Sequence, residues 1–345
     1  MKILIVKLSS IGDIIHTLPA LAAIKNALPE AEISWAVEKN AAELLRRNPL
    51  LSQLIELDTK NLRLNQETIG KSLAAARQFK ELRASRFDVA LDFQGLLKSA
   101  TVAKISRAER RYGFSRRNLR EPASRFLLTE TIEVAPRVHV IVKNLTLAAK
   151  ALKIPIPTEN FDFPVFTDEN HRQEAEKIIL QAGANFAILN PAGGWVTKLW
   201  EAEKFGALAD RLWEQTGLIS IVTTAPNEKT LAAKVLKSSH SGKIIHAEPT
   251  LKGFYELAKH AAVYIGGDTG PTHLAVAAGA PVVGIFGPTE WWFNGSLNPK
   301  DICVERTDIA CRINCNRRTC SKWICLDIEV EAVLKAVQNR IEEKK

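Results

Sequence analysis

The sequence has 345 residues (38.2 kDa), about twice the length of a typical single domain, which predicts two domains. Its 46% hydrophobic and 25% charged residues are typical of a globular protein and exclude a disordered or fibrous chain. No apolar run is long enough to span a bilayer, and the opening residues lack the features of a secretion signal. We therefore expect a cytoplasmic protein.

The net charge of +9 is confined to the first half of the sequence. Residues 1–165 carry 26 basic and 17 acidic side chains, whereas residues 166–345 carry 21 of each. Eight of the basic side chains fall within 22 residues, and we call them the basic patch: Lys104, Arg107, Arg110, Arg111, Arg116, Arg117, Arg120 and Arg125. The patch predicts an anionic partner, either nucleic acid, phospholipid or an acidic glycan, and the alternative is a solvated basic face.

In the first half, apolar runs that read as buried strands alternate with helical patterns. The predicted strands are 3–8, 32–37, 53–57 and 89–93, and the predicted helices are a stretch ending near residue 28 and then 41–47, 71–85 and 97–105. This alternation is typical of a parallel sheet with helices on both faces. The proline-containing run at 154–158 breaks the pattern and predicts a connection between domains.

The second half repeats the alternation. The predicted strands are 186–189, 219–223, 244–246, 263–265 and 282–286, the predicted helices are 202–216, 228–237, 251–260 and 273–278, and Asp327 is expected to cap a last helix that ends near Arg340. The sequence therefore predicts an α/β protein with two doubly wound, Rossmann-like domains that face a central cleft. It contains neither a P-loop motif nor a dinucleotide-binding glycine motif after the first strand.

A glycine-rich segment at residues 264–279 (YIGGDTGPTHLAVAAG) carries the strongest functional signal. Its glycines would let a ligand approach the backbone, and the N–H groups of Thr269 and Gly270, at the start of a helix, would face an anion. Asp268 would orient the turn or bind a sugar hydroxyl, and His273 would add a hydrogen-bond donor. The alternative is a plain turn in which Asp268 caps the helix.

A second segment, residues 190–200 (NPAGGWVTKLW), also follows a predicted strand. Its glycines, Gly193 and Gly194, and Lys198 would lie at the carboxyl edge of a parallel sheet, where ligands bind. Lys198 would neutralise a phosphate there. An ordinary surface lysine is the alternative.

A third segment, residues 9–13 (SSIGD), follows the first predicted strand. It places Asp13 at the carboxyl end of that strand, where the carboxylate would act as a general base. The alternative is a helix cap formed by Ser10 or Asp13.

All five cysteines lie between Cys303 and Cys325, and four of them have the spacing C-x3-C-x4-C-x4-C: Cys311, Cys315, Cys320 and Cys325. In a cytosolic protein such a cluster favours a metal or reduced thiols over disulfides. However, the spacing lacks the paired C-x2-C knuckles of a zinc site, so both alternatives stay open.

Together these segments resemble glycosyltransferase family 9. The resemblance runs through essentially the whole chain and rests on four strings: the opening KILIVKLSSIGDIIHTLP, DFQGLLKS at 92–99, REP at 120–122 and GDTGPTH at 267–273. Within the family it is strongest for the lipopolysaccharide heptosyltransferases of type I. It implies a GT-B fold in which residues 1–157 bind the acceptor, residues 158–326 bind the nucleotide-sugar, and a helix within 327–345 returns to the first domain.

The resemblance also implies roles for individual residues. Asp13 matches the catalytic aspartate of the family. The implied donor-site residues are Gly193, Gly194, Lys198, Glu228, Asp268, Thr269, Gly270 and His273, and the implied acceptor-site residues are Ser10, Gly12, Lys98, Arg120 and His139. Close relatives carry hydroxyl residues at the two glycine positions, and no role transfers to Trp291 or Trp292.

The implied activity is inverting transfer of heptose from ADP-heptose to the Kdo of Kdo–lipid A. Such a protein would act peripherally on the anionic cytoplasmic face of the inner membrane, without nucleic acid and without a bound metal or other required cofactor, although Mg²⁺ is not excluded. Two alternatives remain. The first is heptosyltransferase II or another family member with a different nucleotide-sugar or acceptor, and the second is a nucleic-acid-binding protein that uses the basic patch.

Overall fold

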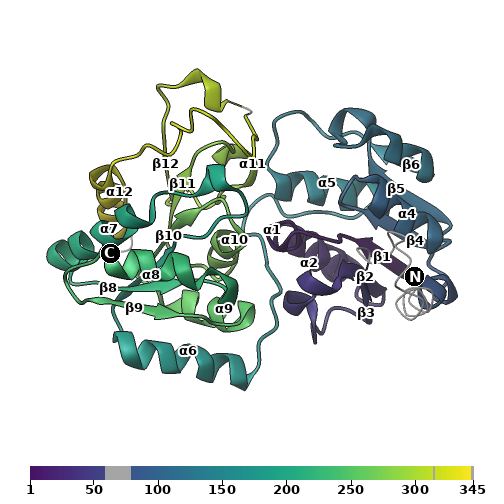
Figure 1. Ribbon diagram of the computed structural model, residues 1–345. Coiled ribbons are helices and arrows are strands. Elements are labelled where there is room, and N and C mark those ends of the chain that lie inside the picture. Colours follow the sequence, from purple (N-terminus) through teal and green to yellow (C-terminus); the bar gives the residue numbers. More distant parts are fainter. Residues whose placement is uncertain (59–78, 314, 343–345) are drawn as a thin grey trace, which may run out of the picture. The chain divides into compact units, whose positions relative to one another are not determined.

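The computed structural model describes residues 1–58, 79–313 and 315–342, and the chain divides into two compact units, Met1–Phe166 and Thr167–Lys345 (Figure 1). Each unit contains one six-stranded parallel sheet. The division falls after Phe166 rather than after residue 157, because the segment that follows the proline-containing run still belongs to the first unit. Its side chains Phe161, Phe163 and Val165 pack against the first hydrophobic core.

The first unit is built from strands that are buried on both faces. Its strands are β1 (Lys2–Val6), β2 (Glu32–Glu38), β3 (Gln53–Leu57), β4 (Val89–Asp92), β5 (Arg110–Phe114) and β6 (Glu130–Ile132), and its helices include α1 (Ile11–Ile15), α2 (Leu18–Ala27), α4 (Leu97–Ile105) and α5 (Val140–Leu152). Along β1, Ile3 and Ile5 join one core, and Leu4 and Val6 join another. This alternation explains why the strand reads as an unbroken apolar run.

The order of the strands in the first sheet is β3-β2-β1-β4-β5-β6. The chain therefore builds outward in one direction from β1 and then in the other direction from β4. The carboxyl ends of these two neighbouring strands form a switch point, where open α/β sheets bind their ligands. Asp13 follows β1, and Lys98 follows β4.

One predicted helix of the first unit is not formed, and another is described only in part. The helix expected at residues 41–47 is wrong: the chain forms two short 3-10 turns, Lys39–Ala41 and Glu43–Leu45. Arg47, with a φ of 58°, and then Pro49 leave no room for a longer helix. Of the helix expected at 71–85, residues 79–84 are helical and residues 71–78 lie outside the described part of the chain.

The second unit repeats this architecture. Its strands are β7 (Phe186–Asn190), β8 (Ile219–Thr223), β9 (Ile244–Ala247), β10 (Val263–Gly267), β11 (Val282–Phe286) and β12 (Ile302–Glu305), and its helices are α6 (Glu169–Ala182), α7 (Ala202–Thr216), α8 (Lys229–Lys237), α9 (Leu251–His260), α10 (Gly270–Ala277), α11 (Trp291–Asn294) and α12 (Val330–Glu342). The order β12-β11-β10-β7-β8-β9 places the switch point between β7 and β10. Lys198 follows β7, and Asp268 follows β10.

The last helix, α12, belongs to the second unit, so the expectation that it returns to the first domain is wrong for the described residues. Its apolar side chains Val333, Leu334 and Val337 join the same core as α7. The buried ion pair between Arg340 and Asp301, 2.8 Å apart, ties its far end to the start of β12. The expected cap at Asp327 is also wrong, because α12 begins at Val330 and the Asp327 carboxylate lies 3.4 Å from the ammonium of Lys204.

In the described ranges, no helix is both long enough and apolar enough to cross a membrane.

Candidate active site

The first candidate group lies after β1 and is built around Asp13. Asp13 stands in the first turn of α1, where the N–H and the hydroxyl of Ser10 both donate to its Oδ2 at 3.1 Å. Its Oδ1 lies 3.2 Å from the ammonium of Lys7, which also donates to the carbonyl of Phe93 at 3.0 Å. Asp13 therefore takes part in capping the helix, as the alternative predicted, while its second oxygen meets a buried cation.

The charge state of Asp13 follows from these contacts. Desolvation alone would raise the pKa of Asp13, but the Lys7 ammonium and the Ser10 donors outweigh it and hold the pKa below its ordinary value. The carboxylate is therefore ionised at neutral pH. Its side chain is 41% exposed, whereas that of Lys7 is only 5% exposed, so a substrate can reach the carboxylate. An ionised carboxylate that a substrate can reach is able to accept a proton from a substrate hydroxyl.

The segment after β4 holds the Asp13 turn in place, and sequence reasoning missed this role. Gln94 donates from Nε2 to the carbonyl of Ser9 at 2.7 Å and accepts from the N–H of Leu8 at 2.8 Å. Asp92 orients the Gln94 turn by accepting from the N–H groups of Gln94 and Gly95. Burial raises the pKa of Asp92 to about 6 despite these bonds. The string DFQGLLKS thus supports the turn that carries Asp13 as well as supplying Lys98.

The proposed acceptor residues of the first unit follow four of its strands, but their side chains differ in availability. Lys98, in α4, donates to Glu38 at 2.6 Å. His139 caps α5, since its Nδ1 accepts from the N–H of Ile141 at 3.2 Å. Arg120 follows β5 and is exposed. Gly12 is buried inside α1.

Lys143, in α5, is a candidate that the sequence did not indicate. Its ammonium donates to the carbonyl of Asn118 at 2.9 Å and lies 4.3 Å from the centre of the Phe114 ring. Burial lowers the pKa of Lys143 to about 8, with the Lys7 charge adding to this effect and the Asp13 charge opposing it. The Coulomb effect of Asp13 places Lys143 within range of the candidate base, so it can contribute to binding an anionic substrate.

The second candidate group lies at the switch point of the second sheet. The ammonium of Lys198 lies 2.5 Å from Oδ2 of Asp268 and 3.2 Å from its backbone carbonyl. Gly267 lets the two loops meet, since a Cβ there would stand 3.1 Å from the carbonyl of Lys198. The ammonium of Lys198 also lies over the ring of Trp195, 4.3 Å from the centre of that ring.

Asp268 is a buried anchor, and the prediction that it orients this turn is consistent with its contacts. Its Oδ1 meets Nε2 of His273 at 3.2 Å and accepts from Nδ2 of Asn294 at 2.9 Å. Desolvation alone would raise the pKa of Asp268, but His273 and Lys198 together hold it well below its ordinary value. The alternative, a cap by Asp268, is not what the structure contains, because Thr269 is the residue that precedes α10.

The N-terminus of α10 lies directly beside this group. Gly270 begins the helix, and Pro271 occupies its first turn without loss of a backbone hydrogen bond. Free N–H groups at such a terminus attract anions. In the loop after β7, a Cβ on Gly193 would come within 2.9 Å of Leu199, whereas the space around Gly194 is open.

Glu228 lies in a 3-10 turn after β8, Pro226–Glu228, and its carboxylate accepts from the N–H of Ala225 at 2.9 Å. Near it, Thr224 contacts Nε2 of His246 at 2.8 Å. Glu228 is therefore oriented by the turn that contains it, at the carboxyl end of the neighbouring strand.

Four buried polar atoms of the second unit have no hydrogen-bond partner among the described residues: Oδ1 of Asn190, Oγ of Ser220 within β8, Oγ1 of Thr289 and Oδ1 of Asn294. Asn190 ends β7, and Asn294 is the residue that bonds Asp268. Buried polar atoms without partners are costly, so these positions are candidates for contact with a ligand. Only the position of Asn190, at a strand end in a glycine-rich segment, was visible in the sequence.

Trp291 has a packing role. Its ring lies edge-on to Phe286, with centroids 4.9 Å apart. A Cβ at Gly284 or Gly295 would come within 2.4 Å of this ring, so both glycines make room for it. Trp292 is 37% exposed and contacts Phe293 edge-on.

Comparison with known proteins gives these groups a context. Residues 75–323, more than two thirds of the chain, match the family Glycosyltransferase family 9 (heptosyltransferase). The chain belongs to glycosyltransferase family 9. It is therefore a glycosyltransferase, and its two parallel sheets are those of the GT-B fold, as the sequence predicted.

Individual relatives agree with this family. The chain is 28% identical to lipopolysaccharide heptosyltransferase 1 of Pseudomonas aeruginosa over 93% of this chain and 88% of the relative. It is 26% identical to the protein of that name from Escherichia coli K12, over 84% and 89%.

Solved structures of family members share the fold. E. coli heptosyltransferase WaaC with ADP-2-deoxy-2-fluoro heptose has a TM-score of 0.77 at 22% identity, and the similarity covers all of both chains. E. coli ADP-heptose lps heptosyltransferase II also has a TM-score of 0.77, at 18% identity over 100% of this chain and 99% of that one.

Proposed function

We propose that this glycosyltransferase transfers heptose from ADP-heptose to the lipopolysaccharide inner core, with the Kdo of Kdo–lipid A as acceptor and inversion at the heptose anomeric carbon. Family membership and the names of the relatives support heptose transfer. A structural relative was solved with an ADP-heptose analogue, which supports ADP-heptose as the donor.

The observation that carries the proposal is the Lys198–Asp268 pair beside the N-terminus of α10. Asp268 holds the ammonium, and the ammonium and the N–H groups of Thr269 and Gly270 bind the diphosphate of the donor. As the bond to the sugar breaks, negative charge grows on the departing ADP. A fixed cation and a helix terminus stabilise that charge without rearrangement, which lowers the barrier. Glu228 binds the nucleoside, and the open space at Gly194 admits the phosphates.

In the first unit, Asp13 is the general base. The oxygen of an acceptor hydroxyl forms the new bond to the anomeric carbon of heptose, and its proton passes to the Asp13 carboxylate. The bond between that carbon and the diphosphate oxygen breaks, and its electron pair leaves with ADP. Ser10 and Lys7 hold the carboxylate in place, and the acceptor carboxylates and phosphates bind Arg120, Lys98 and Lys143.

The acceptor is presented on an anionic membrane, and the part of the basic patch that follows β5 is the surface that meets the cytoplasmic face of the inner membrane. Phe126 supports this, because its side chain is 73% exposed and its ring lies 4.6 Å from the guanidinium of Arg125. An exposed aromatic ring among arginines is typical of a peripheral membrane contact. The protein is expected to co-sediment with vesicles of anionic lipid, and equal co-sedimentation with neutral vesicles would contradict this surface.

The experiment that tests the proposed function is mass spectrometry of Kdo–lipid A incubated with the protein and ADP-heptose. The expected product is the acceptor plus one heptose residue, together with one ADP. The matched control is Asp13→Asn, which should give almost no product. Transfer only to an acceptor that already bears heptose would assign the protein to heptosyltransferase II, and transfer only from a UDP- or GDP-sugar would refute the donor.

A further inference from the structure

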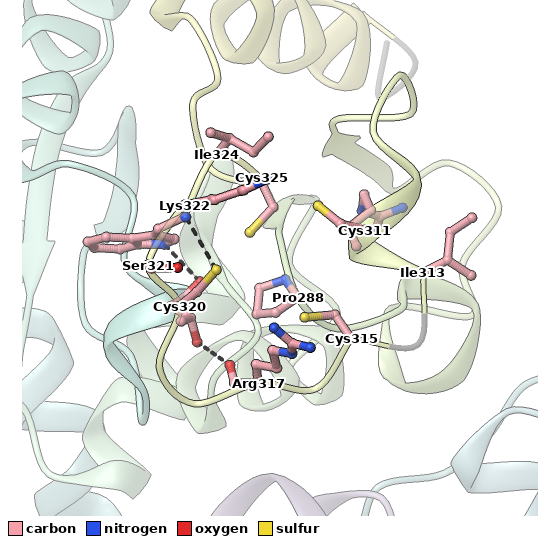
Figure 2. Close-up of a pocket in the computed structure, with 13 residues that line it drawn as sticks. Pro288, Cys311, Ile313, Cys315, Arg317, Cys320, Ser321, Lys322, Ile324 and Cys325 are labelled. Atoms are coloured by element: carbon pink, nitrogen blue, oxygen red, sulfur yellow. Dashed lines mark hydrogen bonds between the residues drawn. The ribbon is translucent and has the colours of Figure 1, made fainter.

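Four cysteines line one pocket of the second unit, next to the turn that carries Lys198. The pocket measures about 490 Å³ and is lined by Pro288, Thr197 and described residues of the segment 311–325, which we call the cysteine loop. Figure 2 shows the sulfur atoms of the four cysteines turned toward the middle of the pocket, where Pro288 lies: Cys311, Cys315, Cys320 and Cys325. The fifth cysteine, Cys303, lies outside it, in β12.

The cysteine loop contains little regular secondary structure. Apart from the 3-10 turn Ala310–Arg312, its described residues form no helix or strand. Several of its large apolar side chains face solvent: Ile313 is 64% exposed, Ile324 39% and Trp323 36%. A loop with so little buried apolar surface is typically fixed by a disulfide or a metal, and the structure pairs none of these cysteines in a disulfide.

The surroundings of the sulfurs suit thiolates. The N–H of Trp323 donates to the sulfur of Cys320 at 3.3 Å. Gly287, directly after β11, leaves room for the side chain of Cys325, since a Cβ at this position would stand 3.1 Å from the Cys325 sulfur. Backbone N–H groups that donate to sulfur are a regular part of thiolate metal sites.

The charge of the segment fits the same interpretation. Residues 311–325 carry four basic side chains and not one acidic side chain. A divalent ion bound by four thiolates has a net charge of about −2. Arg317, Arg318 and Lys322 would compensate that charge, which is otherwise unfavourable on a protein surface.

We propose that Cys311, Cys315, Cys320 and Cys325 together bind one thiophilic metal ion, either zinc or iron, as four thiolates. Each thiol loses its proton to solvent when the ion binds, and thiolate sulfur selects such ions over magnesium or calcium. In the described residues, no three possible ligands stand close enough to hold an ion, and the pocket is far larger than an ion with its ligands. Binding therefore brings the side chains of the four cysteines closer together.

The site would connect to the donor group through Thr197. The hydroxyl of Thr197 donates to the carbonyl of Arg317 at 2.6 Å, and Trp323 donates from Nε1 to the carbonyl of Thr197 at 3.2 Å. Thr197 immediately precedes Lys198. A bound ion that fixes the cysteine loop thus also fixes the turn that presents Lys198. The metal site does not depend on the identity of the donor sugar.

The test is elemental analysis of the full-length protein purified without chelators. We expect about one zinc or iron ion per chain, as for a four-thiolate site, and the element found decides between the two. Growth with cobalt should give a protein with the visible absorption bands of tetrahedral cobalt and intense near-ultraviolet charge-transfer bands from thiolate. Cys320→Ser should lose most of the metal and both sets of bands.

The matched control is Cys303→Ser, a change of the same type at the one cysteine outside the pocket, and it should keep the metal. Metal-free wild-type protein that also fails to bind added zinc, iron(II) or cobalt would overturn the proposal. So would thiol labelling and mass spectrometry that find the four cysteines joined as two disulfides, or a Cys320→Ser variant that keeps its full metal content.

A second readout keeps the proposal testable if Cys320→Ser folds poorly. Removal of the ion from the wild-type protein with a chelator should speed hydrogen exchange at the amides of the cysteine loop and of Thr197 and Lys198, while the amides of β8 stay protected. Exchange that is unchanged throughout, in protein shown to have lost its metal, would contradict the role of the ion.

Discussion

Each unit places a lysine–aspartate pair at the switch point of its sheet, but the two pairs present opposite partners. In the first unit, the Lys7 side chain is 5% exposed and that of Asp13 is 41% exposed. In the second unit, Lys198 is 13% exposed and Asp268 only 4%. The more exposed partner is thus a carboxylate in the first pair and an ammonium in the second, where both side chains are largely buried.

Under the proposed function, this difference means that the more buried partner sets the geometry and the more exposed partner meets the substrate. A lysine buried beneath Asp13 keeps it ionised and ready to take a proton. A buried Asp268 fixes Lys198, so the cation is already in place when charge develops on a leaving group. The same two residue types therefore serve proton transfer in one unit and charge stabilisation in the other, and each of the following changes tests one side of the comparison.

The largest effect is expected for Asp13→Asn. The amide oxygen still accepts from Ser10, so the turn keeps its shape, but the base is lost. Turnover should fall by about two to four orders of magnitude in steady-state assays. Asp88→Asn is the control, since Asp88 accepts from the backbone N–H of Lys2 at the amino edge of the same sheet. Turnover within a factor of a few of wild type in Asp13→Asn would remove Asp13 from the mechanism.

Lys198→Met should lower kcat/KM for the donor by about two to three orders of magnitude, as for loss of one fixed donor at a developing charge. It also leaves a buried carboxylate short of a partner, which costs about 3–5 kcal/mol of stability. The double variant Lys198→Met/Asp268→Asn should regain thermal stability but not activity. Recovery of both would mean that Lys198 is only structural. Lys204→Met, which changes a lysine paired with Asp327, is the control.

Arg120→Ala should raise the acceptor KM by about tenfold or more, as for loss of a charged hydrogen bond of about 1.5–3 kcal/mol, and leave the donor KM nearly unchanged. Arg120→Lys should restore part of the loss, because lysine keeps the charge without the planar fork. Arg107→Ala is the control, since Arg107 belongs to the basic patch but precedes β5 at the opposite edge of the sheet. An altered donor KM would show that the acceptor is not bound by the first unit.

The smallest effect concerns pH. Below pH 8, Lys143 is charged and attracts an anionic acceptor; above it, the ammonium loses its proton, because burial lowers its pKa to about 8. The acceptor KM should therefore rise roughly three- to tenfold between about pH 7 and 9, while the donor KM stays level. Lys143→Met should remove this rise. A parallel rise in both constants would place the titrating group elsewhere.

Most of the fold could be predicted, because strands buried on both faces leave unbroken apolar runs. The strand at 282–286 and the helices at 202–216 and 251–260 were predicted with the bounds that β11, α7 and α9 have. The strand β5 was not predicted, because two of its five residues are arginines that belong to the basic patch, so it lacks an apolar run. The wrong placement of α12 has a different reason: its apolar face fits any open sheet surface, and only tertiary packing selects the core beside α7.

The candidate sites show the same limit. Asp13, Lys198 and Asp268 stand out because each follows a strand in a segment rich in small residues. The sequence did not indicate which residue of each pair is the more buried one. Burial depends on contacts between distant parts of the sequence, such as the hydrogen bonds of Lys7 to Phe93 and of Asn294 to Asp268. Lys143 was missed for the same reason, since its pKa depends on neighbours far away in the sequence.

Titration calorimetry with ADP on Asp13→Asn and Lys198→Met, side by side with the wild-type protein, tests the division between the two pairs most directly. ADP lacks the sugar and the acceptor, so only the donor group contributes to its binding. The account predicts an ADP affinity for Asp13→Asn within about twofold of wild type and a loss of tenfold or more for Lys198→Met, about 1.4 kcal/mol. Equal losses in the two variants, or a loss confined to Asp13→Asn, would contradict it.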